Sequence, residues 1–129
     1  MEINPSKRVL IVDDEEPVRA ICVRTLEPLG YWVKTAANAE EAMAALEKEA
    51  ADLVVTDYRM PGVMDGLALG QAIKRRFPQT QIILMTAFPA VDTAVGTLRL
   101  GALDYLVKPF DQAELIRCVN ICFTKKAAA

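Results

Sequence analysis

Five short apolar runs alternate with longer segments of helical periodicity along the chain, and this order constrains the fold more than any other feature. The runs are Arg8–Val12, Tyr31–Ala36, Leu53–Thr56, Gln81–Met85 and Leu103–Val107. The first, third and fourth are almost continuously apolar, as strands covered on both faces are, and the other two are more mixed, as strands near a sheet edge are. Repeated strand–helix units predict an α/β fold, with a parallel sheet, helices on both faces and right-handed crossovers.

The segments between and after these runs carry apolar residues at the spacing of one helix face. Spacings of i, i+3, i+4 and i+7 cover residues 18–29, 39–46 and 91–98, a sparser stripe covers 69–77, and a last apolar face covers 115–123. Asn38 followed by Glu41 predicts a capping box at a helix start. Helix ends are expected at Gly30, before Pro78 and at Gly101.

Length and composition exclude several classes of protein. A chain of 129 residues fits one domain over residues 1–129, with a core at about 7–124 and a tail or linker stub at 125–129. The net charge of −2 argues against direct nucleic-acid binding. The absence of histidine excludes Ser-His-Asp hydrolysis and His-ligated zinc or haem.

The cysteines and the lengths of the apolar runs indicate the cellular compartment in which the protein is expected to lie. Cys22, Cys118 and Cys122 lie among apolar or helical neighbours and are expected to be buried free thiols in a reducing compartment. No apolar run approaches the ~20 residues that a bilayer span needs, and no basic-then-apolar leader pattern is present. We therefore expect a cytoplasmic protein without a membrane partner.

Polar side chains follow four of the predicted strands. Asp13 and Asp14 follow the first strand, Asp57 the third, Thr86 the fourth and Lys108 the fifth. In a doubly wound sheet, ligands bind outside the carboxyl ends of the strands, so these side chains are expected to converge. Carboxylates held close together repel one another unless a cation joins them, and an oxygen-only ligand set favours Mg2+. With the lysine and the threonine as donors to phosphoryl oxygens, the set suits formation of an acyl phosphate on an aspartate.

Each of these residues has a simpler explanation when it is taken alone. Glu15 and Glu16 are expected to be charges at a helix N-terminus, and Asp13 and Asp14 fit the same role. Asp57 fits a turn aspartate, and the lysine and threonine fit a solvated side chain and a strand-end cap. The joint occurrence of complementary charges at several strand ends favours a functional site.

Taken together, the motifs resemble the receiver domain of bacterial two-component response regulators, which has the chemotaxis-type fold. The resemblance covers about residues 7 to 124. The matching segments are VLIVDDEEPVR (Val9–Arg19), LVVTDYRMPG (Leu53–Gly62), MDG (Met64–Gly66), IILMTA (Ile82–Ala87) and GALDYLVKPF (Gly101–Phe110). It implies a flavodoxin-like (βα)5 doubly wound sheet of five parallel strands in the order 2-1-3-4-5.

The resemblance also implies roles for the residues at the strand ends. Asp57 corresponds to the phosphoacceptor and Lys108 to the lysine that contacts the phosphoryl group, through a Lys108–Pro109 bond that is usually cis. Asp14 corresponds to the direct Mg2+ ligand, Asp13 to its partner acting through water, and the backbone carbonyl of Arg59 to a third protein ligand beside Asp57. The implied cofactor is Mg2+.

A phosphorylation switch is the function that the resemblance implies. Thr86 corresponds to the switch hydroxyl and Tyr105 to the switch aromatic residue. The expected phosphodonor is a sensor histidine kinase or a phosphotransfer protein. The expected output surface comprises residues 91–100, 104–107 and the last helix, for homodimerisation, for an effector or for a DNA-binding output domain outside this chain. The domain is expected to be no enzyme beyond Mg-dependent self-phosphotransfer and autodephosphorylation, whose rate Arg59 and Phe88 are expected to tune.

One departure from the family pattern is visible, and other functions remain as alternatives. MPGVMDG (Met60–Gly66) carries one residue more than the usual loop before the third helix. An aspartate-nucleophile phosphohydrolase would need a D-x-D pair and a cap domain, and a flavodoxin-like electron carrier would need a first loop that does not repel phosphate as DDEEP does. The runner-up is a phosphorylation-independent protein-interaction module of the same fold.

Overall fold

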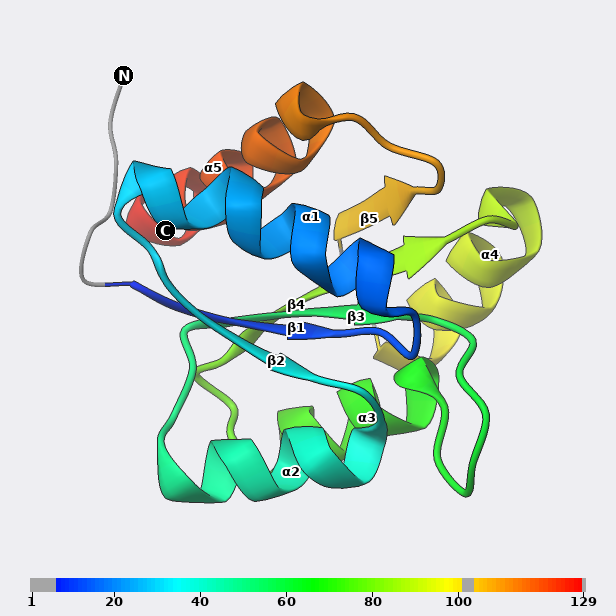
Figure 1. Cartoon of the computed structure of the whole chain (residues 1–129). Helices are drawn as coiled ribbons and strands as arrows, with labels where there is room; N and C mark the ends of the chain where they lie inside the picture. The colour runs from blue at the N-terminus through cyan, green and yellow to red at the C-terminus, as the bar shows by residue number, and fades with distance from the viewer. Residues whose placement is uncertain (1–6, 101–103, 129) are drawn as a thin grey trace.

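A five-stranded parallel sheet forms the middle layer of the fold, in the order β2-β1-β3-β4-β5 with β3 at its centre (Figure 1). The structure is a computed structural model, and it describes residues 7–100 and 104–128, with side chains described as far as residue 124. The strands are β1 (Arg8–Val12), β2 (Trp32–Ala36), β3 (Leu53–Asp57), β4 (Gln81–Thr86) and β5 (Asp104–Val107). Both the α/β class and the strand order therefore agree with the sequence-based expectation.

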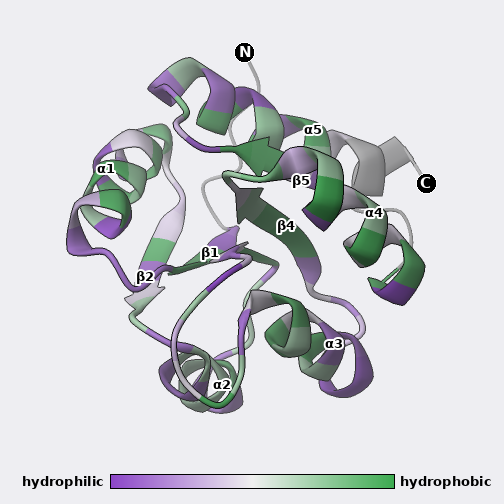
Figure 2. Ribbon diagram, turned by 90° about the vertical axis from the view of Figure 1, so that its right-hand side faces the viewer, coloured by the Kyte–Doolittle hydropathy of each residue, from purple (hydrophilic) through white to green (hydrophobic). Residues whose placement is uncertain are grey.

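Helices cover both faces of this sheet. They are α1 (Glu16–Leu26), α2 (Ala39–Lys48), α3 (Gly66–Arg76), α4 (Pro89–Leu100) and α5 (Gln112–Ala128), and a 3-10 turn η1 (Glu27–Leu29) follows α1. α1 and α5 pack on one face, and α2, α3 and α4 lie on the other (Figures 1 and 2). The backbone of α5 includes residues 125–128 of the segment expected to be a tail or linker stub. The expected helix end at Gly101, the expected strand start at Leu103 and the terminal Ala129 lie outside the described residues.

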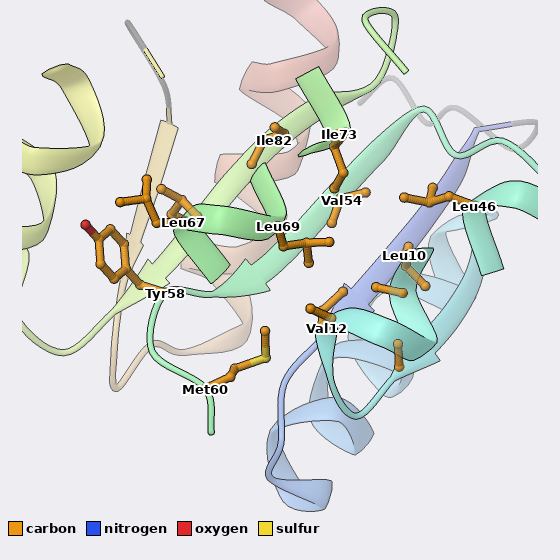
Figure 3. Packing of buried hydrophobic residues seen from close by; sticks show 14 of the residues in the cluster. Leu10, Val12, Leu46, Val54, Tyr58, Met60, Leu67, Leu69, Ile73 and Ile82 are labelled. Carbon is orange, nitrogen blue, oxygen red and sulfur yellow. The ribbon is translucent and has the colours of Figure 1, made fainter. Parts of the chain in front are cut away.

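The period of two along the central strands explains their continuous apolar sequence. In β1, Val9 and Ile11 contribute to the core beneath α1 and α5, whereas Leu10 and Val12 contribute to the core over α2 and α3. Figure 3 shows the second of these cores, where Leu69 of α3 packs among strand side chains. Figure 2 shows β4 as hydrophobic along most of its length, as expected for a strand with a helix layer on each side.

The edge strands and the helix caps also follow from the sequence. In β2 only Ala36 is buried, which fits its mixed pattern and its edge position. Asn38 caps α2 by accepting a hydrogen bond of 2.8 Å from the Glu41 amide, and the Glu41 carboxylate accepts one of 2.9 Å from the Ala37 amide. The expected capping box is therefore present, with its return bond made to the residue before the cap.

The Met60–Gly66 loop, which the sequence predicts to be one residue longer than usual, has an exposed tip. Gly62 has a φ of 114°, a left-handed conformation that favours glycine, and the next residue, Val63, is 98% exposed. Asp65 then caps α3 by accepting a hydrogen bond of 2.9 Å from the Ala68 amide. The start of α3 is therefore fixed by this side-chain cap.

Two further expectations concern the cysteines and membranes. Cys22 and Cys122 are buried as expected, whereas Cys118 is partly exposed, and none of the three forms a disulfide with another described cysteine. Within the described part of the chain, no helix combines the length and the apolar character needed to cross a membrane.

Candidate functional site

Three carboxylates meet at the carboxyl end of the sheet. Asp13 and Asp14 directly follow β1, and Asp57 is the last residue of the adjacent β3. One oxygen from each of these carboxylates lies within 4.8 Å of the others. Asp13 is fully buried and Asp57 is 9% exposed, whereas Asp14 is exposed. The three carboxylates therefore lie together, as their strand-end positions predicted.

The backbone around Asp13 explains why its carboxylate is fixed. Its amide donates to the Ala36 carbonyl at 3.1 Å, which holds the residue beside β2. Its carbonyl accepts a hydrogen bond of 2.7 Å from the Arg19 guanidinium. Its Oδ1 accepts one of 2.8 Å from the Glu15 amide, and Glu15 is the N-cap of α1. Glu15 and Glu16 thus lie at the helix start, as their simpler explanation expected.

Lys108 brings a positive charge to the carboxylates from beyond β5. Its amide donates to the Thr86 carbonyl at 2.8 Å, and the Lys108–Pro109 peptide is cis, as the resemblance implied. Its Nζ lies 2.7 Å from Oδ2 of Asp13 and 3.5 Å from Oδ1 of Asp57. Burial on its own would lower the pKa of Lys108, but the hydrogen bond and ion pair with Asp13, with Asp57 adding to them, raise it above its usual value.

The electrostatics of the cluster favour a second cation. Burial raises the pKa of Asp57 from 3.8 to about 6, repulsion from Asp13 and Asp14 adds to the rise, and Lys108 opposes it. One ammonium faces three acidic groups whose donor atoms are all oxygens. A hard divalent ion such as Mg2+ suits this set, because Mg2+ accepts few carboxylate ligands and keeps waters.

Gly66 allows α3 to start directly against the phosphoacceptor candidate. A Cβ at Gly66 would overlap the backbone carbonyl oxygen of Asp57. The Gly66 amide donates to the Tyr58 carbonyl at 3.0 Å, and the Tyr58 amide donates to the Met85 carbonyl at 2.8 Å. The chain leaving β3 is therefore held between β4 and the first turn of α3.

The Thr86 hydroxyl is bonded to a carboxylate outside the acidic cluster. It donates a hydrogen bond of 2.6 Å to Oδ2 of Asp92, in the first turn of α4. The other oxygen of Asp92 lies 2.6 Å from Nη2 of Arg59, and the guanidinium of Arg59 also lies over the Phe88 ring, 5.1 Å from its centroid. Arg59 was expected to offer its backbone carbonyl to a metal and, with Phe88, to tune autodephosphorylation. In the structure its side chain belongs to this second network, beside Asp92 and Phe88.

Sequence reasoning did not identify Asp92 as a functional candidate. The only signal in the chain is an acidic residue six positions after Thr86, at the start of a predicted helix. Such residues are common charges at helix N-termini and are usually solvated. In the structure Asp92 is 1% exposed.

Tyr105 lies in β5 and reaches the side of α4. Its hydroxyl donates to the Thr93 carbonyl at 3.4 Å. It occupies the space beside Gly96, where a Cβ would overlap it. Burial raises the pKa of Tyr105, so the phenol is protonated and able to donate at neutral pH.

Comparison with family models gives one match that covers most of the chain. Residues 9–120 match the model described as "Response regulator receiver domain". The DNA-binding transcriptional regulator NtrC of Salmonella typhimurium is 43% identical over 112 residues, which are 87% of this chain and 24% of that protein. The response regulator protein FleR of Pseudomonas aeruginosa is also 43% identical over 112 residues, with the same coverage. The chain spans about a quarter of the length of these curated relatives.

Solved structures with a similar fold match this chain over nearly their whole length. Chemotaxis response regulator CheY4 of Vibrio cholerae has a TM-score of 0.82 and 32% identity, covering 89% of this chain and 97% of that one. Response regulator protein TrrA of Thermotoga maritima, solved in complex with Mg2+–BeF, has a TM-score of 0.79 and 34% identity, covering 90% and 98%. The similarity therefore extends across the sheet and the helices around it.

Proposed function

The chain belongs to the response regulator receiver family, and we propose that it is a phosphorylation switch whose phosphoacceptor is Asp57. The observation that carries the proposal is the convergence of Asp13, Asp14 and Asp57 beside the ammonium of Lys108. Asp57 is the last residue of the central strand β3, and burial raises its pKa. When a carboxylate becomes an acyl phosphate, it loses its own negative charge. The negative charge of the phosphoryl group then lies beside the neighbouring cations.

The proposed reaction is transfer from a phosphohistidine of a sensor kinase or a phosphotransfer protein. An oxygen of Asp57 attacks phosphorus in line, the P–N bond breaks as the P–O bond forms, and the histidine nitrogen retains the electron pair. Lys108 is already within 3.5 Å of Asp57 and neutralises charge on the transferred group. Later attack of water on the phosphorus resets the switch.

The acidic cluster is the proposed Mg2+ site. Asp14, Asp57 and the backbone carbonyl of Arg59 would hold the ion, and Asp13 would act through water. When bound, Mg2+ would supply charge neutralisation for the phosphoryl oxygens. The TrrA structure with Mg2+–BeF supports this assignment, because TrrA resembles this chain over nearly its whole length.

A partly apolar groove next to Lys108 supports a protein as the phosphodonor. It has a volume of about 390 Å3 and is lined by Pro17, Val18, Ile21, Ala87 and Phe110, together with Glu15, Lys108 and Pro109. A surface of this kind contributes binding energy through apolar contacts and leaves the charged cluster free for the phosphoryl group. The donor would dock between the start of α1 and the segment that joins β5 to α5.

The proposed output surface is the face formed by α4, β5 and α5. Val91 and Leu98 of α4, Val107 of β5 and Ile121 of α5 are large apolar side chains that remain exposed. We propose that phosphorylation changes this face and so controls homodimerisation, an effector or a DNA-binding output domain. The name of NtrC, a DNA-binding transcriptional regulator, supports the last of these for the longer protein.

Mass spectrometry after incubation with acetyl phosphate and Mg2+ tests the proposal. We expect the wild type to gain one phosphoryl group and Asp57→Asn to gain none. Asp65→Asn is the matched control, because Asp65 is an exposed helix cap and asparagine caps equally well. It should be phosphorylated like the wild type. An unmodified wild type, or equal modification of Asp57→Asn, would refute the assignment and favour the phosphorylation-independent interaction module.

A further inference from the structure

Asp92 is a buried carboxylate that the proposed phosphotransfer does not use. Only 1% of its surface is exposed. Its Oδ2 accepts the Thr86 hydroxyl at 2.6 Å, and its Oδ1 is 2.6 Å from the Arg59 guanidinium. Burying a carboxylate is costly unless charge-assisted partners offset the loss of water. These two contacts therefore determine where the first turn of α4 lies relative to β4 and to the loop after β3.

The Thr86 hydroxyl can serve only one acceptor at a time. It has a single proton, which it donates to Asp92, while its oxygen accepts the Phe88 amide at 2.8 Å. Donation to a phosphoryl oxygen on Asp57 requires that the bond to Asp92 is broken first. Asp92 and a phosphorylated Asp57 are thus competing acceptors for the same proton.

A second contact restrains the same face of α4. Gly96 lies one turn after Asp92 and leaves the space that the Tyr105 hydroxyl fills. That hydroxyl also donates to the Thr93 carbonyl at 3.4 Å. Both strand residues therefore hold α4. Thr86 does so through the carboxylate of Asp92, and Tyr105 does so by packing against Gly96. Figure 1 shows α4 beside β5, at the end of the sheet where β4 finishes.

We propose that Asp92 is a positioning residue that keeps α4 in its resting place by competing with the phosphoryl group on Asp57 for the Thr86 hydroxyl. The inference rests on the proposed function, because the competitor exists only if Asp57 is phosphorylated. When Thr86 turns away, Asp92 loses one of its hydrogen bonds while still buried, so the carboxylate and the first turn of α4 move toward solvent. Arg59, whose side chain is 57% exposed, can follow the carboxylate.

Amide chemical shifts of α4 in isotope-labelled protein measure the two conformations. Unphosphorylated wild type gives one end point, and wild type treated with acetyl phosphate and Mg2+ gives the other. Without phosphodonor, we expect Asp92→Asn and Asp92→Ala to shift along the line between these points, with the alanine variant moving further. Loss of a hydrogen bond to a charged group should raise the ratio of moved to resting conformation about tenfold or more.

A double-mutant cycle separates positioning from a general loss of structure. In a Thr86→Val background, the added effect of Asp92→Ala on the α4 shifts should disappear, because the hydroxyl through which Asp92 acts is gone. Asp111→Asn, which alters an exposed cap of α5, should leave the α4 shifts unchanged. If Asp92→Ala fails to fold, the isosteric Asp92→Asn provides the same comparison.

The outcomes distinguish this inference from the proposed function. If mass spectrometry shows that the wild type is phosphorylated but both Asp92 variants keep the resting α4 shifts, the role of Asp92 is overturned and the phosphorylation switch stands. An undiminished effect of Asp92→Ala in the Thr86→Val background also overturns it. If the wild type is not phosphorylated, the proposed function fails and this inference fails with it.

Discussion

Lys108 forms its shortest ion pair with Asp13, with Nζ and Oδ2 only 2.7 Å apart. The same nitrogen lies 3.5 Å from Oδ1 of Asp57. The lysine therefore neutralises a carboxylate that we propose as part of the Mg2+ site, and the ammonium and the metal ion compete for the same negative potential. Under this proposal two cations share the site, and removing the charge of either partner tests it.

Removal of the ammonium should strengthen Mg2+ binding. We expect Lys108→Met to bind Mg2+ roughly threefold to thirtyfold more tightly than the wild type, because one positive charge near the carboxylates is lost in a partly screened site. Isothermal titration calorimetry measures the affinity. Lys48→Met removes an exposed charge at the end of α2 and should leave it unchanged. Equal or weaker binding by Lys108→Met would show that the ammonium does not compete with the metal.

Neutralising Asp57 should stabilise the metal-free protein in a pH-dependent way. The pKa of Asp57 rises from 3.8 to about 6, mainly because of burial and then because of Asp13. The folded state therefore binds a proton on Asp57 more tightly than the unfolded state does. This proton binding stabilises the fold below pH 4, and the stabilisation is lost as the pH rises through about 6. In EDTA near pH 7.5, Asp57→Asn should raise the free energy of unfolding by roughly 1–3 kcal/mol.

Urea denaturation at two pH values tests whether Asp57→Asn raises the free energy of unfolding only at the higher pH. Near pH 4 the wild type and Asp57→Asn should differ little, because the wild-type carboxyl is already protonated. Added Mg2+ should stabilise the wild type more than the variant at neutral pH. A variant that is less stable than the wild type at neutral pH in EDTA would contradict the electrostatic account of the site.

The sequence was sufficient to predict which residues meet at the ends of the strands. Parallel strands place their carboxyl ends at one edge, so the positions of Asp13, Asp57 and Lys108 after three apolar runs already predicted their convergence. The contacts of Asp92 were beyond this reasoning, since they depend on how closely α4 approaches β4. The preference of Lys108 for Asp13 over Asp57 depends on side-chain geometry at the scale of about 1 Å, which no periodicity encodes.

Cys22 should be chemically inert in the folded protein. Burial raises the pKa of its thiol to about 12, the Asp13 carboxylate adds to the rise, and Lys108 opposes it. At pH 8 the reactive thiolate is then on the order of one molecule in 10,000. We expect iodoacetamide to label the partly exposed Cys118 first and to label Cys22 only after unfolding in urea. Peptide mass spectrometry measures both rates, and labelling of Cys22 as fast as Cys118 would contradict the burial.

Gly66 should be the glycine whose replacement most damages the site. A methyl group at Gly66 overlaps the carbonyl oxygen of Asp57, which is backbone and cannot turn away as a side chain can. Gly66→Ala must therefore displace either α3 or the end of β3. We expect the free energy of unfolding, measured by urea denaturation, to fall by roughly 2–4 kcal/mol and Mg2+ to bind more weakly.

Gly62→Ala is the control, because a methyl group on Gly62 would meet nothing within 4 Å and would be disfavoured only by the φ of 114°. Its cost should be about 1 kcal/mol with Mg2+ affinity unchanged. If both variants lose stability equally and bind Mg2+ like the wild type, the close approach of α3 to Asp57 does not shape the metal site.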